Sequence, residues 1–536
     1  MSLKIAIAQI NCLVGDIQAN TQQILKFAQQ AYQQQADLVV FPELTLTGYP
    51  PEDLLLRNKL HQQIEIALKK IINEAPPCTL IMGYPRKIKG NLYNSAGIIQ
   101  NGRLIAEYYK NKLPNYSVFD ERRYFKAGKK SCVVKIKNTL IGLTICEDIW
   151  FQKPAKKAKK AGAEILININ ASPYHLNKTK QREKQVSKIA KRYQLPIIYN
   201  NLVGGQDELV FDGQSFVLDH KGQLTQRLKA FKTQLAMVYF NNKQQPRLTK
   251  ISPLQNENKQ IYHALVLATR DYVYKNGFKG AVLGLSGGID SALTLAIAVE
   301  ALGAENVEVV LMPSRYTADI SNLDAVKQAK KLKVKYRSIA IEPAFNAFLE
   351  MLKEEFKGTK TDTSEENIQA RCRGIILMAI SNKKGKILLT TGNKSEMSVG
   401  YATLYGDMAG GYAPIKDLYK TKVYELSLWL NRKQEIIPNR VITRPPSAEL
   451  APDQKDSDSL PDYAILDAIL KRFVEQDESI EKIIKAGYDD QIVKRVALMV
   501  DRNEYKRRQA PPGVKITARA FGRDRRYPLS NGFNQK

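Results

Sequence analysis

The sequence predicts an α/β protein built from two domains, and three observations lead to this prediction. Short apolar runs typical of buried strands alternate with helix patterns along the chain of 536 residues. Hairpin signals accompany the strands of the first half, whereas strand and helix simply alternate in the second half. A polar stretch with two prolines, residues 241–253, separates the halves and is typical of a linker. We therefore expect one domain over residues 1–242, a linker over 243–258 and a second domain over 259–536.

The first half begins with an alternating strand at residues 3–9 and continues with a buried strand at 38–41, which Pro42 ends. The dipeptide Asn101-Gly102 joins two strand patterns and is the strongest short hairpin signal. Further strands are expected at 79–83, 91–100, 103–109, 133–136, 140–145, 165–169 and 197–199. Hairpins mixed with β-α units favour an α/β sandwich over a purely parallel sheet.

The second half follows the rhythm of a Rossmann-like parallel sheet, in which helices connect consecutive strands. Helices are expected at 259–276 and 322–332, and strands at 281–285, 307–312 and 387–391. Ligands bind such sheets outside the carboxyl ends of the strands. We therefore expect the binding site of the second domain at that edge.

Composition places the chain among ordinary globular proteins, since 44% of its residues are hydrophobic and 25% are charged. No apolar run of about 18 residues is present, so no membrane span is expected. The N-terminus lacks the features of a signal peptide, and the five cysteines are scattered without a C-x-x-C pair, which favours a reducing cytoplasm. The net charge of +29 fits nucleic-acid binding, anionic substrates or a drift toward lysine. We favour the last two, because the basic residues are spread along the chain.

The strongest chemical signal is a glycine-rich loop between an expected strand and an expected helix. It consists of Gly284, Leu285, Ser286, Gly287, Gly288, Ile289, Asp290 and Ser291. Its glycines let the backbone turn tightly near a ligand, and backbone N–H groups and serine hydroxyls then face the positive end of the helix. This arrangement predicts a phosphate site, although the G-K-[ST] ending of a Walker loop is missing.

The loop resembles that of the ATP pyrophosphatases, which cut ATP between its α- and β-phosphates and adenylylate a substrate. Further motifs at 312–316, 366–371, 391–396 and 405–417 extend the resemblance to the NAD synthetase domain, over about residues 259–513. The resemblance implies that ATP contacts the loop together with Arg315, Arg371, Thr391 and Lys420. It also implies contacts to deamido-NAD⁺ from Asn367, Glu396, Asp407 and Lys506, and Mg²⁺ bound by Asp290 and Glu396.

In the first half, three reactive residues each follow an expected strand: Glu43, Lys110 and Cys146. A cysteine thiolate is a strong nucleophile, but the thiol has an ordinary pKa of about 8.5 and needs a base and a nearby cation. Glu43 is suited to take the proton, and Lys110 to stabilise the oxyanion of a tetrahedral intermediate. Lys112 lies two residues from Lys110, and strand alternation places both on one face, so spacing alone does not choose between them.

The order and local motifs of these residues resemble the nitrilase superfamily over about residues 2–240. The resemblance implies an α-β-β-α sandwich, selects Lys110 through the K-x-x-L pattern, and implies that Tyr116, Ser172 and Lys178 bind glutamine. Glu121 is a candidate supporting carboxylate, and His175 is interpreted as structural.

Together the two resemblances imply a cytoplasmic ligase that takes ammonia from glutamine and uses ATP and Mg²⁺ to convert deamido-NAD⁺ to NAD⁺. They also imply a homo-oligomer that assembles through the synthetase domains, with no nucleic-acid or membrane partner. Two alternatives share the glycine-rich loop. GMP synthetase and similar enzymes carry a Cys-His glutaminase, which the first domain lacks. A tRNA-thiolating enzyme needs a catalytic cysteine in the second half, where Cys372 is the only cysteine and lies within an expected helix.

Overall fold

The computed structural model describes residues 3–533, and the chain divides into two compact units between Gln255 and Asn256. This division falls inside the segment 243–258 expected to be a linker. Helix α5 (Glu257–Lys275) begins before the end of that segment, because the side chain of Asn256 accepts a hydrogen bond from the Lys259 N–H and caps the helix. Each unit is described by itself below.

The first unit contains two six-stranded mixed sheets. The first sheet has the order β14-β1-β2-β3-β4-β5, and the second has the order β13-β12-β9-β8-β7-β6. The strands of the first sheet are β1 (Leu3–Gln9), β2 (Leu38–Val40), β3 (Thr79–Ile88), β4 (Asn91–Gln100), β5 (Arg103–Tyr109) and β14 (Gln234–Phe240). Those of the second are β6 (Val133–Ile136), β7 (Thr139–Ile145), β8 (Ile165–Asn170), β9 (Ile197–Asn201), β12 (Phe216–Leu218) and β13 (Leu224–Arg227). A two-stranded ribbon of β10 (Val203–Gln206) and β11 (Leu209–Asp212) completes the unit.

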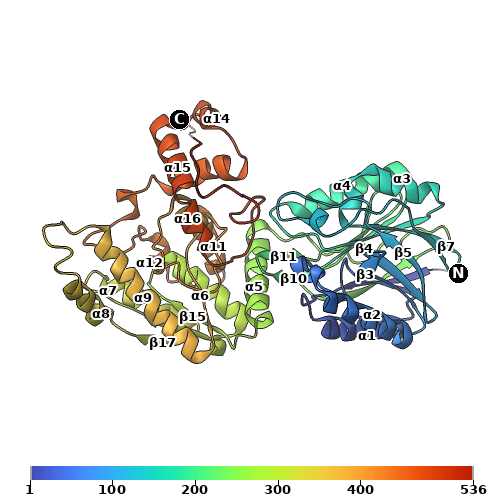
Figure 1. Ribbon diagram of the computed structural model, residues 1–536, viewed down its shortest axis with the longest axis horizontal. Coiled ribbons are helices and arrows are strands. Elements are labelled where there is room, and N and C mark those ends of the chain that lie inside the picture. Colours follow the sequence, from blue (N-terminus) through green and yellow to red (C-terminus); the bar gives the residue numbers. More distant parts are fainter. Residues whose placement is uncertain (1–2, 534–536) are drawn as a thin grey trace. The chain divides into compact units, whose positions relative to one another are not determined.

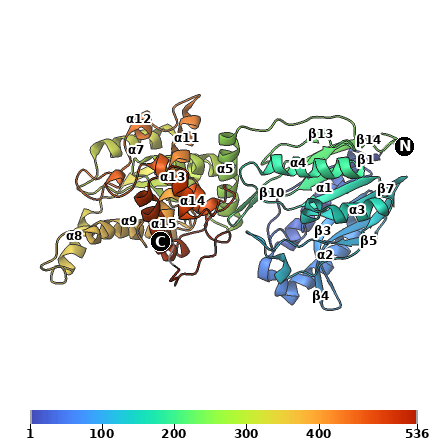
Figure 2. The ribbon, with the colours of Figure 1, turned by 90° about the horizontal axis from the view of Figure 1, so that it is seen from above.

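Helices cover the outer face of each sheet, which gives the expected α-β-β-α sandwich (Figure 1). Helices α1 (Ile17–Gln33) and α2 (Asn58–Glu74) pack on the first sheet, and α3 (Gln152–Lys160) and α4 (Lys178–Tyr193) pack on the second. Figure 2 shows α3 and α4 side by side on their sheet. The inner faces enclose an apolar core in which alternate strand residues, such as Ile5 and Ile7 of β1 and Ile141 and Ile145 of β7, are buried.

The second unit is built on a four-stranded parallel sheet of order β17-β16-β15-β18. Its strands are β15 (Ala281–Gly284), β16 (Val307–Leu311), β17 (Lys335–Ser338) and β18 (Ile387–Leu388). Helices α6 (Ile289–Leu302) and α9 (Thr363–Lys384) both contact β15, and α7 (Asp319–Lys331) contacts β16 and β17. The parallel sheet confirms the predicted fold class of this half.

Smaller helices complete the second unit. They are α8 (Glu342–Met351), α10 (Lys394–Val399), α11 (Lys420–Asn431), α12 (Asn439–Thr443), α13 (Tyr463–Leu470), α14 (Ile480–Lys485), α15 (Asp490–Arg502) and α16 (Glu504–Arg508). Buried residues of α10, α13, α14 and α15 belong to one apolar cluster. Short helical turns complete the chain: η1 (Glu52–Leu56), η2 (Glu121–Arg123), η3 (Cys146–Trp150), η4 (Ala304–Asn306), η5 (Asp456–Asp458) and η6 (Lys471–Glu475).

The structure corrects one strand and confirms the central hairpin. The strand expected at 387–391 ends at Leu388, because Leu389 and Thr390 bridge to Tyr412 outside the named strands. The predicted hairpin is present, with Gln100 opposite Arg103 and with φ of 50° at Asn101 and 68° at Gly102. No helix among the described residues is long and apolar enough to cross a membrane.

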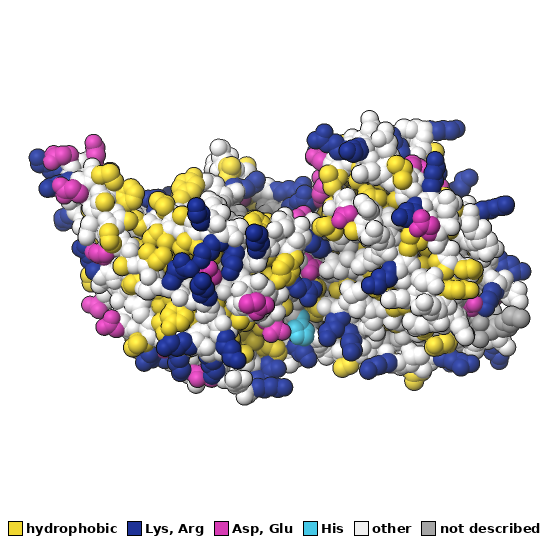
Figure 3. Space-filling view, turned by 90° about the horizontal axis from the view of Figure 1, so that it is seen from below, with side chains coloured by type: hydrophobic (Ala, Val, Ile, Leu, Met, Phe, Trp, Pro, Cys, Tyr) yellow, Lys and Arg dark blue, Asp and Glu magenta, His cyan; other side chains and the backbone are white. Residues whose placement is uncertain are grey.

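Basic side chains do not gather in one stripe on the face of the molecule that Figure 3 shows. Lys and Arg are dispersed there among uncharged and hydrophobic side chains. In the sequence, too, the basic residues are spread along the chain.

Candidate active sites

In the first unit, the ends of three strands bring the predicted nucleophile, base and cation together. Glu43 follows β2 and Lys110 follows β5, both in the first sheet, whereas Cys146 follows β7 in the second sheet. The Lys110 Nζ donates to Glu43 Oε1 and to Glu121 Oε1, at 2.7 Å each. The side chains of Lys110 and Glu43 are fully buried. The predicted residues therefore share one site, and Glu121 is part of it.

Each carboxylate of this cluster has further hydrogen-bond partners. Glu43 accepts from Asn94 Nδ2 at 2.7 Å and from the Ala171 N–H at 2.9 Å. Glu121 accepts from the Tyr49 hydroxyl at 3.0 Å. Burial and the charge of Glu43 raise the pKa of Glu121 to about 7, although Lys110 opposes this shift. The cluster thus holds two acidic groups and one cation away from bulk water.

Cys146 lies at the tight turn where β7 ends, with a φ of 43°. A left-handed backbone at a residue other than glycine costs about 1–3 kcal/mol and is common at functional sites. Burial raises the pKa of the Cys146 thiol, Glu43 raises it further, and Lys110 lowers it. Burial therefore favours the neutral thiol over the thiolate.

The structure separates Lys110 from Lys112. Strand β5 ends at Tyr109, so neither lysine belongs to the strand whose alternation was expected to orient both. The Lys112 Nζ lies 4.5 Å from the centre of the Phe151 ring instead of in the carboxylate cluster. The spacing of the two lysines in the sequence could not show this difference, because the turn after β5 sets the directions of both side chains.

The three residues expected to bind glutamine surround the cysteine turn in different ways. The Tyr116 hydroxyl donates to Glu147 Oε2 at 3.0 Å, although 57% of this tyrosine is exposed. The Lys178 Nζ lies 4.6 Å from the centre of the Trp150 ring. Burial and the charge of the neighbouring Arg182 together lower the pKa of Lys178 to about 8.

Ser172 is held by a buried ion pair. Its hydroxyl accepts from Arg182 Nε at 3.1 Å, and Arg182 also pairs with Asp212 at 2.7 Å. The Nδ1 of His175 lies 2.8 Å from the Leu176 carbonyl oxygen. Glu147 was missed by sequence reasoning, and its position directly after Cys146 was the available signal.

A cavity of about 290 Å³ lies at the carboxyl ends of β15, β16 and β18 in the second unit. The expected ATP, dinucleotide and metal residues that line it are Gly284, Leu285, Ser286, Gly288, Ile289, Asp290, Ser291, Thr391, Glu396, Asp407 and Lys420. Gly287 has a φ of 82°, and a Cβ there would lie 2.3 Å from the Ser321 carbonyl oxygen. The tight turn of the loop therefore requires glycine at this position.

Two acidic side chains of the cavity converge on one lysine. The Lys420 Nζ donates to Asp290 Oδ2 at 2.5 Å and to Glu396 Oε1 at 3.1 Å. Asn393 Nδ2 donates to the other Asp290 oxygen at 2.8 Å. Burial raises the pKa of Glu396 to about 8, and Asp290 and Asp456 raise it too, while Lys420 lowers it. This concentration of negative charge is suited to binding a further cation.

Besides Gly287, four expected residues do not line the cavity. Arg315 pairs with Glu342 on the surface, and the exposed Arg371 donates from Nε to the Leu404 carbonyl at 3.3 Å. Asn367 accepts from the Thr403 hydroxyl at 2.7 Å. The Lys506 Nζ donates to the carbonyls of Gly400 and Ala402 at 2.8 Å each.

Sequence reasoning missed four charged residues that do line this cavity: Arg373, Arg444, Glu449 and Asp456. The Arg373 Nε donates to the Met312 carbonyl at 3.1 Å, and Arg444 Nη1 donates to the Ser321 hydroxyl at 2.8 Å. Arg373 lies two residues from Arg371 on helix α9, and such residues face different directions. No motif in the sequence distinguished the two arginines.

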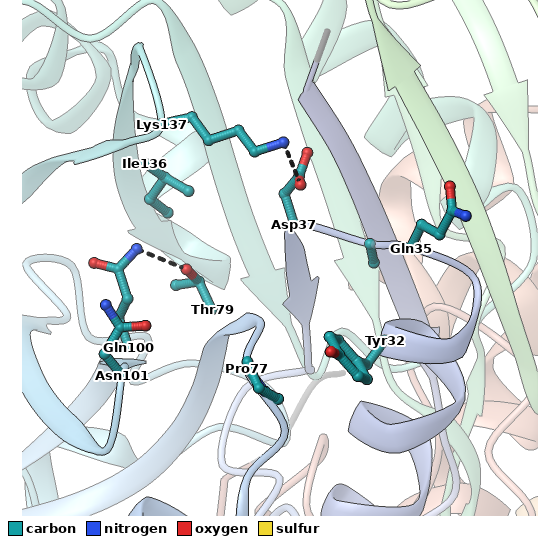
Figure 4. A pocket seen from close by; sticks show the side chains of 10 residues that line it. Tyr32, Gln35, Asp37, Pro77, Thr79, Gln100, Asn101, Ile136 and Lys137 are labelled. Carbon is teal, nitrogen blue, oxygen red and sulfur yellow. Dashed lines mark hydrogen bonds and ion pairs between the residues drawn. The ribbon is translucent and has the colours of Figure 1, made fainter. Parts of the chain in front are cut away.

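A second cavity, of about 550 Å³, lies in the first unit at the opposite ends of its strands (Figure 4). Its polar side chains largely satisfy one another. Lys137 pairs with Asp37 at 2.5 Å, and Gln100 Nε2 donates to the Thr79 hydroxyl at 3.1 Å. It contains none of the predicted site residues.

Comparison with known proteins identifies the family of each unit. The carbon-nitrogen hydrolase family matches residues 4–243, and the NAD synthase family matches residues 261–510. Glutamine-dependent NAD⁺ synthetases of Acinetobacter baylyi and Thermotoga maritima are 47% and 43% identical, each over 99% of this chain and 99% of the relative. A solved glutamine-dependent NAD⁺ synthetase of Acinetobacter baumannii, in complex with ADP, is 44% identical over 100% of both chains, with a TM-score of 0.82.

The solved glutamine-dependent NAD⁺ synthetase of Cytophaga hutchinsonii has the same fold, with a TM-score of 0.85 at 24% identity over 99% of this chain and 98% of that one. The two family matches cover the two units in order, and the full-length relatives share both. Neither alternative enzyme class considered from the sequence has this pairing. The chain therefore belongs to the glutamine-dependent NAD⁺ synthetase family.

Proposed function

We propose that this chain converts deamido-NAD⁺ to NAD⁺ with ATP, using ammonia that it releases from glutamine. The observation that carries the proposal is the buried ion pair of Lys110 and Glu43 beside Cys146, in a chain whose second unit carries a phosphate loop. The residues around Cys146 are suited to hydrolysing an amide, and the phosphate loop is suited to activating a carboxylate with ATP. The enzyme is a ligase that forms a C–N bond with glutamine as amido donor.

In the first unit, Glu43 takes the thiol proton as the Cys146 sulfur attacks the amide carbon of glutamine. The Lys110 ammonium faces the negative charge that develops on the amide oxygen. Glu43 returns the proton to the amide nitrogen, the C–N bond breaks, and ammonia leaves a thioester on Cys146. Water, deprotonated by Glu43, then hydrolyses the thioester to glutamate. Tyr116, Ser172 and Lys178 are the proposed glutamine contacts.

In the second unit, the carboxylate of deamido-NAD⁺ attacks the α-phosphorus of ATP and pyrophosphate leaves. Ammonia then attacks the carbonyl carbon of the acyl adenylate, and AMP leaves as NAD⁺ forms. The loop from Gly284 to Ser291 is proposed to hold the phosphates, and Lys420 to offset their charge. Asn367, Glu396, Asp407 and Lys506 are proposed to contact deamido-NAD⁺. Arg315 and Arg371 remain proposed ATP contacts although they lie outside the cavity.

The donor set of this cavity fits Mg²⁺. Asp290 and Glu396 offer carboxylate oxygens that converge on one point, now contacted by the Lys420 Nζ. No cluster of three or more His, Cys, Asp or Glu in residues 3–533 could hold a metal alone, which fits an ion that takes its remaining ligands from phosphates. When bound there, Mg²⁺ would neutralise phosphate charge.

We further infer that the protein is cytoplasmic and assembles into a homo-oligomer through its synthetase unit. Scattered cysteines are typical of a reducing compartment. Met351 on α8 and Ile375 on α9 are 67% and 58% exposed, and we propose that this part of the synthetase unit contacts the other subunit. Sedimentation of the wild type and of Ile375→Glu tests this inference, and an unchanged assembly state would exclude the α9 face.

The decisive test of the proposed function uses glutamine labelled with ¹⁵N in its side-chain amide, together with ATP, deamido-NAD⁺ and Mg²⁺. We expect NAD⁺ that carries the label, with glutamate, AMP and pyrophosphate formed in equal amounts. Unlabelled NAD⁺ would contradict the amidotransferase reaction. Formation of ADP and phosphate would contradict the pyrophosphatase chemistry.

A further inference from the structure

Asp148 lies between the lysine-bearing and cysteine-bearing segments of the first unit and binds both. Its Oδ1 accepts from the backbone N–H of Asn111 at 3.1 Å and of Lys112 at 2.8 Å. Its Oδ2 accepts from the Ile145 N–H at 3.1 Å and from the Tyr108 hydroxyl at 2.7 Å. Asp148 is fully buried. Four donors from two distant parts of the chain therefore meet on one carboxylate.

These two segments belong to different sheets. Lys110 follows β5 in the first sheet, and Cys146 follows β7 in the second. The core between the sheets is apolar, and apolar contacts fix no direction. Hydrogen bonds are directional, so the carboxylate of Asp148 adds a constraint that packing lacks. The Asp148 carboxylate connects the segment that carries Lys110 with the segment that carries the Cys146 sulfur.

The bond to Ile145 acts directly on the turn of the nucleophile. Cys146 has a left-handed backbone, and η3 begins at this residue. The Asp148 side chain reaches back to the N–H of the residue just before Cys146. A strained turn persists only when its surroundings fix it.

Asp148 forms these bonds without an ion-pair partner among residues 3–533. Its carboxylate oxygens accept hydrogen bonds from three backbone N–H groups and one hydroxyl. No Lys, Arg or His among the described residues lies within ion-pair distance of them. A buried charge without a counter-ion is costly unless hydrogen bonds satisfy it. Burial raises the pKa of Asp148 to about 6, whereas the Tyr108 hydroxyl, the backbone donors and the charge of Lys110 lower it.

We propose that Asp148 is a positioning residue of the glutaminase site, which sets the placement of Lys110 relative to Cys146 by holding both backbone segments. The inference rests on the proposed role of Cys146 in glutamine hydrolysis. Asp148 does not touch the substrate. Its effect should therefore fall on kcat for glutamine and leave KM for glutamine nearly unchanged.

The test is Asp148→Asn in the full chain. The amide keeps the size of the side chain but turns one acceptor into a donor, which then faces an N–H or O–H donor. A misplacement of about 1 Å costs about 10²-fold in rate. We expect kcat for glutamine hydrolysis to fall about 10²-fold with KM within about threefold of wild type, and NAD⁺ formation from ammonium to be retained. Activity is divided by the number of active sites, which are counted by their reaction with a glutamine-like electrophile. Protein that has not folded is therefore left out of kcat.

Two variants make the test specific. Tyr108→Phe removes one donor and leaves the three backbone bonds, so kcat should fall less than about fivefold. Glu164→Gln is the matched control, because Glu164 accepts from the Leu140 N–H at 2.8 Å at the other end of β7, and it should leave kcat unchanged. A loss in Tyr108→Phe or Glu164→Gln as large as in Asp148→Asn would overturn the proposal.

Hydrogen exchange gives a readout that does not depend on activity. In Asp148→Asn, peptides covering 108–112 and 140–146 should both exchange faster, while peptides from the opposite strand ends should not change. Unchanged exchange in either peptide, or wild-type kcat per titrated site, would overturn the proposal. If Asp148→Asn does not fold, Asp148→Glu, which keeps both oxygens but shifts them, must show the same loss of kcat. A wild type that is not labelled at Cys146 by the electrophile would contradict the proposed function itself.

Discussion

Replacing Lys110 with alanine, in comparison with Lys112→Ala, is the sharpest test of the glutaminase site. The Lys110 Nζ lies 2.7 Å from both Glu43 and Glu121, and its side chain is fully buried. Lys112 is partly exposed, and its Nζ lies 4.5 Å from the centre of the Phe151 ring. The two substitutions remove the same atoms from neighbouring positions with different surroundings.

The structure predicts different magnitudes for the two losses. Removing one partner of a buried ion pair typically destabilises a protein by about 3–5 kcal/mol, because the remaining charge is left without a partner. Lys110→Ala leaves two such carboxylates, so one of them must take up a proton. Loss of an oxyanion-stabilising group lowers the rate by about 10²- to 10³-fold. Lys112→Ala removes only a partly exposed cation–π contact of about 0.5–1 kcal/mol, and its backbone N–H still donates to Asp148.

A double variant separates stability from catalysis. Glu121→Gln in the Lys110→Ala background removes one of the two stranded charges, so the unfolding midpoint should recover in part. Glutamine hydrolysis should not recover, because no cation returns to the site. The assay compares glutamate release, ammonium-dependent NAD⁺ formation and thermal unfolding for all the variants.

The outcome can refute the reasoning in two ways. If Lys112→Ala loses more glutaminase activity than Lys110→Ala, with both proteins folded, the catalytic role belongs to Lys112. If the double variant regains glutamine hydrolysis together with stability, Lys110 is needed only to balance charge. Ammonium-dependent synthesis serves as the internal control, because the second unit is unchanged.

Four further outcomes are expected. Cys146→Ala should abolish glutamine-dependent NAD⁺ formation while high ammonium restores it, and glutamine use at the wild-type rate would exclude Cys146 as the nucleophile. Asp290→Ala should abolish synthesis with either nitrogen source but leave some glutamine hydrolysis, so ammonium-dependent synthesis near the wild-type rate would contradict the loop assignment. Burial and Arg182 lower the pKa of Lys178 to about 8, so its charge is lost above that pH, and KM for glutamine should rise about tenfold from pH 7 to pH 9. The Lys178→Arg variant keeps its charge, so its KM for glutamine should rise only as far as the amino group of glutamine itself loses its proton. If KM changes with pH in the same way in the wild type and in Lys178→Arg, Lys178 does not bind the substrate. Chelation of divalent cations should stop NAD⁺ synthesis and spare glutamine hydrolysis, and equal inhibition of both would contradict the proposed Mg²⁺ site.

The sequence predicted the parts of each site that local motifs encode. The sequence placed Glu43, Lys110 and Cys146 because each follows a predicted strand, Glu43 and Lys110 in the first sheet and Cys146 in the second. The glycine-rich loop could also be predicted from the sequence, because the backbone at Gly287 leaves no room for a side chain. In both cases a short segment determines its own geometry.

Residues whose roles depend on distant partners were not predictable in the same way. Arg373 faces the cavity and Arg371 faces outward, a choice set by how α9 packs on the sheet. Asp148 lies two residues after Cys146, but its partners at 108, 111 and 112 are more than 35 residues away. A sequence pattern carries no record of such contacts, so only the tertiary structure shows them.

Both candidate sites hold one lysine between two carboxylates, and their different exposure is suited to different chemistry. Around Lys110 the Glu43 side chain is fully buried, so the cation cannot leave without stranding a charge and remains available to an oxyanion. Asp290 and Glu396 are each 16% exposed and line a cavity of about 290 Å³. Under the proposed function these oxygens would hold Mg²⁺, whose charge would help to neutralise the phosphates of ATP. We infer that the closed cluster serves a reaction that needs a fixed cation, and that the open cluster frees the lysine to meet the incoming phosphates.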